Sequence, residues 1–185
     1  MAAPTDTDDS LLAELAIPHR AKAAYRRLLA RGLAPMPAVR RGLKHQNADV
    51  RYWCCQYLDR FLEPEALADL IARLDDVDPR VRLSTLHTLD CDRCKEGDCR
   101  PEEAAVLPRA LQMLATDPDA HVRAHAVGLV GRWVHASAAA EAALRTAMAS
   151  DSNPTVRKKA GWYVPGGPIH ERTRPKPQRR SKAVA

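Results

Sequence analysis

The clearest clue to the architecture of this chain is the stretch DPRVRLSTLHTL at residues 78–89. The same pattern returns as NADVRYWCCQYL at 47–58, DAHVRAHAVGLV at 119–130 and NPTVRKKAGWYV at 153–164. Each copy begins with Asp or Asn, which are strong N-cap residues because their side-chain oxygen accepts a hydrogen bond from a free helix amide. Alanine or proline follows at the first helical position, where proline is tolerated. Each copy therefore predicts a helix that starts at this cap.

The apolar residues of each copy fall on one side of the predicted helix. Counted from the valine of the Val-Arg pair, the residues at four and eight positions give a helical stripe: Cys54, Thr85, Ala126 and Ala160, then Leu58, Leu89, Val130 and Val164. Amphipathic stretches at 64–74, 101–115 and 137–149 predict partner helices, while 18–31 and 37–45 predict a capping helix and the first partner. Because one helix pair of this size cannot bury its own apolar face, we expect the pairs to stack.

The repeated Asp or Asn, Val-Arg and small residue resemble the second helix of HEAT repeats, and are similar to the short bacterial units of phycobilisome-lyase HEAT-like proteins. The resemblance covers residues 36–165 and implies an all-α, right-handed α-solenoid of about four helix pairs with an N-terminal capping helix. We expect residues 11–167 to form this domain, with an insertion at 91–100. An acidic disordered segment, 1–10, would precede it, and a basic disordered tail, 168–185, would follow.

Four arginines recur in register in the four copies, namely Arg51, Arg82, Arg123 and Arg157, and so do Asp76, Asp117 and Asp151. In HEAT-like repeats the equivalent arginine pairs with acidic groups or turn carbonyls between units, so the resemblance implies a structural ladder. The alternative is that the inner arginines and the basic tail contact nucleic acid. The net charge is +6, but the chain before residue 168 has 23 basic against 22 acidic residues, so this alternative depends mainly on the tail.

The capped helices are expected to line the inner surface of the solenoid. Residues three and six positions after each valine should then face outward, and they include two tryptophans, which give much contact area at little entropic cost. We predict that a protein or peptide partner binds Trp53, Gln56, Ser84, His125, Lys159 and Trp162. The alternative for Trp53 and Trp162 is that they cover the two end repeats.

No catalytic constellation is recognised in the sequence, so we predict an interaction module rather than an enzyme. Hydroxylases with HEAT repeats use repeated His-Glu pairs to hold iron, whereas this chain has one, His170-Glu171. DNA glycosylases of this fold use aromatic and acidic residues on a basic face. Trp53, Asp59 and Trp162 are candidates for such a site, but the nearly neutral body lacks the required charge.

The five cysteines form two groups. Cys54 and Cys55 fall on the apolar side of their helix and are predicted to be core residues. The other three lie in the inserted segment LDCDRCKEGDCRP, four residues or more after His87. Their spacing predicts a closed structural zinc site with the ligands His87, Cys91, Cys94 and Cys99. Free thiols, a Cys94–Cys99 disulfide and an iron–sulfur site remain as alternatives.

The N-terminal residues MAAPTDTDDS carry three aspartates and no apolar run, which is unlike a secretory signal. No apolar stretch approaches the length needed to span a membrane. We therefore expect a cytoplasmic protein with no membrane partner.

Overall fold

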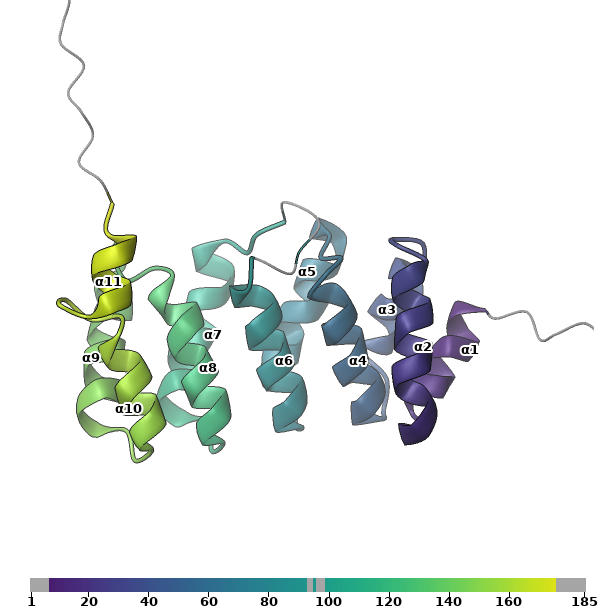
Figure 1. The fold of residues 1–185 in the computed structure, drawn as a ribbon, viewed down its shortest axis with the longest axis horizontal. Helices are drawn as coiled ribbons and strands as arrows, with labels where there is room; N and C mark the ends of the chain where they lie inside the picture. The colour runs from purple at the N-terminus through teal and green to yellow at the C-terminus, as the bar shows by residue number, and fades with distance from the viewer. Residues whose placement is uncertain (1–6, 93–94, 96–98, 176–185) are drawn as a thin grey trace, which may run out of the picture.

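The computed structural model describes residues 7–92, 95 and 99–175. Within these residues the chain forms eleven α-helices, one short 3-10 helix and no strand. The helices stand side by side in an elongated stack, with the first helices at one end and the last at the other (Figure 1). This arrangement confirms the predicted all-α solenoid of stacked helix pairs.

The four repeated stretches form the helices that their caps predict. These are α4 (Ala48–Leu58), α6 (Pro79–Asp90), α8 (Ala120–Gly131) and α10 (Pro154–Gly161). The side chain of each predicted N-cap accepts a hydrogen bond from a backbone amide two residues later: Asn47 and Asp78 at 2.8 Å, Asp119 at 2.7 Å and Asn153 at 2.8 Å. The predicted helix starts are therefore confirmed.

The partner helices lie in a second layer behind the capped helices (Figure 1). They are α3 (Met36–Gly42), α5 (Pro64–Ile71), α7 (Glu103–Thr116) and α9 (Ala138–Ser150), and α5 continues into the 3-10 turn Ala72–Asp75. Within the front layer α4 packs on α6, α6 on α8 and α8 on α10. The valines of the repeat and the residues four and eight positions later are all buried, as are Cys54 and Cys55. The predicted apolar stripe is the core.

Both ends of the stack contain a helix that the sequence analysis missed. At the N-terminus α1 (Asp8–Leu15) precedes α2 (Pro18–Ala30), and Leu11 and Leu15 of α1 are buried. At the C-terminus α11 (Pro168–Thr173) places His170 in the interior with only 7% of its surface exposed. The predicted disorder is therefore wrong for residues 8–10 and 168–173, because short helices are stabilised here by packing on the end repeats. Residues 1–6 and 176–185 also belong to the two predicted disordered segments, and they lie outside the described residues.

No helix in the part of the chain that the structure describes is both long enough and apolar enough to cross a membrane.

Candidate functional site

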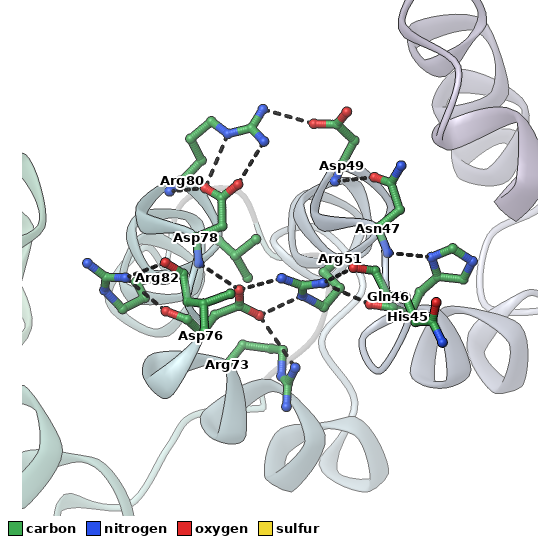
Figure 2. A network of polar contacts seen from close by, with 12 residues as sticks. His45, Gln46, Asn47, Asp49, Arg51, Arg73, Asp76, Asp78, Arg80 and Arg82 are labelled. Atoms are coloured by element: carbon green, nitrogen blue, oxygen red, sulfur yellow. Dashed lines mark hydrogen bonds and ion pairs between the residues drawn. The ribbon is translucent and has the colours of Figure 1, made fainter.

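The recurring arginines lie between successive repeats, and Figure 2 shows the first of them, Arg51. Its Nε and Nη2 atoms donate to the two carboxylate oxygens of Asp76, both at 2.7 Å, in a bidentate pair. Its Nη1 atom donates to the backbone oxygens of His45 and Gln46, both at 2.8 Å. The guanidinium thus ties its own helix to the loop before it and to the next repeat.

The same pair recurs twice along the stack. Arg82 binds Asp117 at 2.7 and 2.9 Å, and Arg123 binds Asp151 at 2.8 and 2.9 Å. Arg157, in the last capped helix, donates instead to the backbone oxygens of Asp151 and Ser152, at 2.6 and 3.1 Å. Among the described residues it forms no ion pair with a carboxylate.

Each of these aspartates also organises the loop that leads to the next capped helix. Asp76 accepts a hydrogen bond from the amide of Asp78 at 3.0 Å, and Asp78 is the N-cap of α6. Asp117 and Asp151 accept equivalent bonds from Asp119 and Asn153, at 2.9 and 2.8 Å. One carboxylate therefore joins the arginine of one repeat to the cap of the following repeat.

These arginine–aspartate contacts, which form the structural ladder, test the hypothesis that the inner arginines bind phosphate groups. In Arg51, Arg82 and Arg123 the Nε, Nη1 and Nη2 atoms all donate to protein acceptors, and bidentate pairing with carboxylate is the geometry that guanidinium prefers. These three side chains are structural, and the hypothesis is wrong for them. The basic residues of 176–185 lie outside the described residues.

One predicted partner-binding residue does not face the surface. Ser84 is only 1% exposed, and its hydroxyl accepts a hydrogen bond from the Nε2 atom of Gln56 at 2.9 Å. The prediction for Ser84 is wrong because α4 and α6 pack closely at this level, so that the position three residues after the valine points between them. Gln56 is partly exposed, but its amide group is directed to Ser84.

Trp53 belongs to a cluster of aromatic side chains on the front layer. Its ring centroid lies 4.9 Å from that of Tyr25 in α2 and 5.3 Å from that of Tyr52 in α4. All three residues are partly exposed and pack against the core. We call Tyr25, Tyr52 and Trp53 the aromatic patch. Sequence analysis missed the two tyrosines, because Tyr25 lies outside the repeat and Tyr52 comes one residue before the first position that was expected to face outward.

A shallow groove adjoins the aromatic patch. Its volume is about 430 Å³, and it is lined by Tyr52, Pro79, Arg80, Leu83, Asp119 and His121. These residues come from the N-terminal halves of α4, α6 and α8 (Ala120–Gly131) and, in the case of Asp119, from the N-cap of α8. The groove therefore runs across neighbouring repeats, beside a set of rigid aromatic rings.

The C-terminal half of the front layer carries polar groups instead. Gly128 leaves room for Asp90, since a Cβ atom at position 128 would lie 2.7 Å from Asp90 Oδ2 and 3.8 Å from the Tyr163 hydroxyl. Burial raises the pKa of Asp90 and lowers the pKa of Lys159 and of His125. The predicted partner-binding residues Lys159 and His125 thus lie in a partly buried polar region. Asp90 also belongs to this region, although it was not predicted from the sequence.

The trio considered for a DNA glycosylase is not assembled. Trp53 lies on α4 and Trp162 follows α10, and two helices of the front layer, α6 and α8, separate them (Figure 1). Asp59, at the C-terminal end of α4, lies beside His87, with 3.6 Å between its Oδ2 atom and His87 Nε2. The interpretation of these three residues as one site is therefore wrong.

The predicted zinc ligands are brought together only in part. His87 and Cys91 lie close to each other and to Asp59, which was not predicted as a ligand. Cys99 is absent from this group and packs against the core. The described residues therefore do not bring Cys99 to His87 and Cys91, and Cys94 lies outside the described residues, so the closed four-residue site stays a prediction.

Comparison with known families identifies part of the repeat. The family model for HEAT repeats matches residues 10–90, which run from α1 to the end of α6. No curated protein and no solved structure matches the chain. The match is to HEAT repeats in general, so the likeness to the phycobilisome-lyase subtype stays a prediction.

Proposed function

Because this chain is a HEAT-repeat protein, we propose that it is a non-enzymatic interaction module that binds a protein or peptide on the layer formed by α4, α6, α8 and α10. Stacked repeats present extended surfaces of this kind, to which each unit contributes a few side chains. We also propose a cytoplasmic location, as the sequence suggests.

The aromatic patch is the observation that carries this proposal. Tyrosine and tryptophan dominate the binding energy of many interfaces, because they offer large amphipathic surfaces and lose little entropy when they are fixed. In this protein the three rings are already held by contacts with one another and with the core. The neighbouring groove gives an apolar side chain of the partner a place beside Tyr52 and Leu83.

The ladder supports a protein partner over nucleic acid. A phosphate-binding surface needs basic side chains that reach the polyanion. The three arginines that recur on the capped helices and bind aspartate donate to the protein itself. Nucleic-acid binding would then depend on the basic residues near the C-terminus, and it would weaken steeply with salt.

The test is affinity capture from nuclease-treated extract, followed by measurement of affinity with the purified partner. Tyr52→Ala and Trp53→Ala should each weaken binding at least tenfold, whereas Met148→Ala should not. Met148 is a suitable control because it is a large, 38% exposed apolar side chain of α9, in the other layer. His125→Ala is tested separately from Trp53→Ala, since α6 lies between their helices.

A partner whose affinity is unchanged in both patch variants would contradict the proposal. So would binding that disappears after nuclease treatment, or that falls with salt in the steep manner of a polyanion complex. Circular dichroism of each variant establishes that the fold is retained, because Tyr52 and Trp53 also pack on the core.

A further inference from the structure

Three side chains with different metal-binding groups converge where α4 and α6 end. Asp59 is the C-cap of α4, His87 lies in the last turn of α6, and Cys91 is the C-cap of α6. Their ligand atoms, a carboxylate oxygen, an imidazole nitrogen and a thiol sulfur, all lie within 4.8 Å of one another. Because the two helices are equivalent elements of successive repeats and pack together, their C-terminal ends meet at this corner.

We propose that Asp59, His87 and Cys91 form a binding site for a divalent ion of the zinc type. Thiolate, imidazole and carboxylate are the three side-chain ligands that zinc uses in proteins. Ligand atoms that share one tetrahedral zinc ion lie roughly 3.3–3.8 Å apart, given bonds of about 2.0–2.3 Å. The 3.6 Å between His87 Nε2 and Asp59 Oδ2 already falls in that range. Cys91 follows His87 by one helical turn, so both side chains leave α6 on the same side.

The site is accessible from solvent. The side chain of His87 is 45% exposed, while that of Asp59 is 14% exposed. An ion can therefore reach the imidazole from the solvent, and the less exposed carboxylate of Asp59 lies next to the imidazole. Three protein ligands leave a fourth tetrahedral position for water or for another donor, as in zinc sites with an open position.

Lys95 brings a positive charge close to the three proposed ligands, where it would repel a metal cation. Its ammonium group donates to the backbone oxygens of Thr88 and Cys91, at the C-terminal end of α6. We therefore expect Lys95→Met to strengthen metal binding, because it removes a repelling charge and leaves the three ligands in place.

This site differs from the one that the cysteine spacing predicts. Both include His87 and Cys91, but Asp59 of the preceding repeat takes the place of Cys99. Cys99 has a pKa raised by burial and by the charge of Glu63, so its thiolate is disfavoured where it lies. The two assignments make opposite predictions for Asp59 and Cys99 variants.

The experiment uses full-length protein that has been stripped with chelator and then titrated with cobalt(II) and zinc(II). Cobalt is a spectroscopic probe, because a thiolate ligand gives a charge-transfer band that imidazole and carboxylate do not give. We expect one equivalent of cobalt with this band, displaced by one equivalent of zinc. Cys91→Ser should abolish the band, and Asp59→Asn and His87→Gln should keep it while lowering the affinity for zinc at least tenfold.

Cys99→Ser is the matched control, since it removes a thiol of the same segment and should leave both band and affinity unchanged. If the parent protein gives no cobalt–thiolate band, the site does not exist. If Cys99→Ser removes the band while Asp59→Asn and His87→Gln bind like the parent, the metal belongs to a different ligand set and the proposal is overturned. Should Asp59→Asn fail to fold by circular dichroism, His87→Gln decides, because this exposed side chain contributes less to packing.

Discussion

Asp76 connects two successive repeats through several hydrogen bonds. Its two carboxylate oxygens bind the Arg51 guanidinium, and Oδ1 also accepts the amide of Asp78 (Figure 2). Its own backbone oxygen accepts a hydrogen bond from Arg82 at 2.8 Å, so it contacts the arginines of two successive repeats. Bonds of this charge-assisted kind are stronger than neutral ones, and here they are largely shielded from water.

Replacing an arginine of the ladder should therefore lower the free energy of unfolding far more than replacing an arginine that is exposed to solvent. Arg82→Ala leaves the Asp117 carboxylate buried without its bidentate partner, and we expect it to lower the free energy of unfolding by ~3 kcal/mol. Arg157→Ala removes only hydrogen bonds to two backbone oxygens, and we expect a loss of ~1 kcal/mol. Urea unfolding of both variants measures the difference, and equal losses would show that the aspartate pair does not set the effect.

At the scale of elements, the end of the stack depends on one close approach between backbones. The amides of Ile169 and His170 in α11 both donate to the carbonyl oxygen of Trp162, at 2.9 and 3.0 Å. Gly167 lies against the end of α10, and a Cβ atom there would be 2.6 Å from Trp162 O and still closer to Gly161 O. The ring of His170 lies 4.4 Å from that of His135, which attaches α11 to the segment after α8.

Gly167→Ala should consequently detach α11 from the last repeat. The neighbouring oxygens belong to the backbone and cannot move aside, so we expect a loss of ~1–3 kcal/mol. We also expect faster hydrogen exchange at the amides of Ile169 and His170. Gly161→Ala is the control, because its Cβ atom would meet only Met148, at 3.6 Å or more, and alanine is the better helix former. Exchange rates that stay unchanged in Gly167→Ala would rule out this account of how α11 is held.

At the scale of the whole molecule, the ladder links the stability of the stack to pH. The hydrogen bond from Arg123 lowers the pKa of Asp151. Burial alone would raise the pKa of Asp76, but bonds from Arg51 and the Asp78 amide outweigh it and lower that pKa as well. Carboxyl groups whose pKa is lower in the folded protein than in the unfolded chain contribute stability above the unfolded value of about 3.9. That contribution is lost as the pH falls through the lower, folded value.

We therefore expect the free energy of unfolding to fall steeply below about pH 4. Between about pH 7 and 5 the two histidines with shifted pKa act in opposite directions, because burial lowers the pKa of His125 and the hydrogen bond to Asp59 raises that of His87. The pKa of Asp90 is raised by burial, so this carboxyl works in the opposite direction and offsets a small part of the loss. Urea unfolding across this pH range measures the curve. Asp151→Asn removes one titrating group of the ladder and should make the loss of stability below about pH 4 less steep. A loss as steep as that of the parent protein would contradict the role assigned to the Arg123–Asp151 pair.

The sequence by itself determined the repeat, its caps and its apolar stripe. These features depend on residues within one helix or one loop, since an N-cap binds an amide two residues away and a buried stripe follows from helical spacing. The recurrence of Asp76, Asp117 and Asp151 in register with the arginines belongs to the same class. It could be found because a repeat places the same chemistry at the same offset in each unit.

Only the tertiary structure decided which side chains from different helices share one place. The burial of Ser84 depends on how closely α4 approaches α6, and the meeting of Asp59 with His87 and Cys91 depends on two helix ends being side by side. The aromatic patch joins Tyr25 of α2 to a later repeat. Spacing along the chain does not determine such contacts, because they follow from the distance and orientation of packed helices, which all the repeats set together.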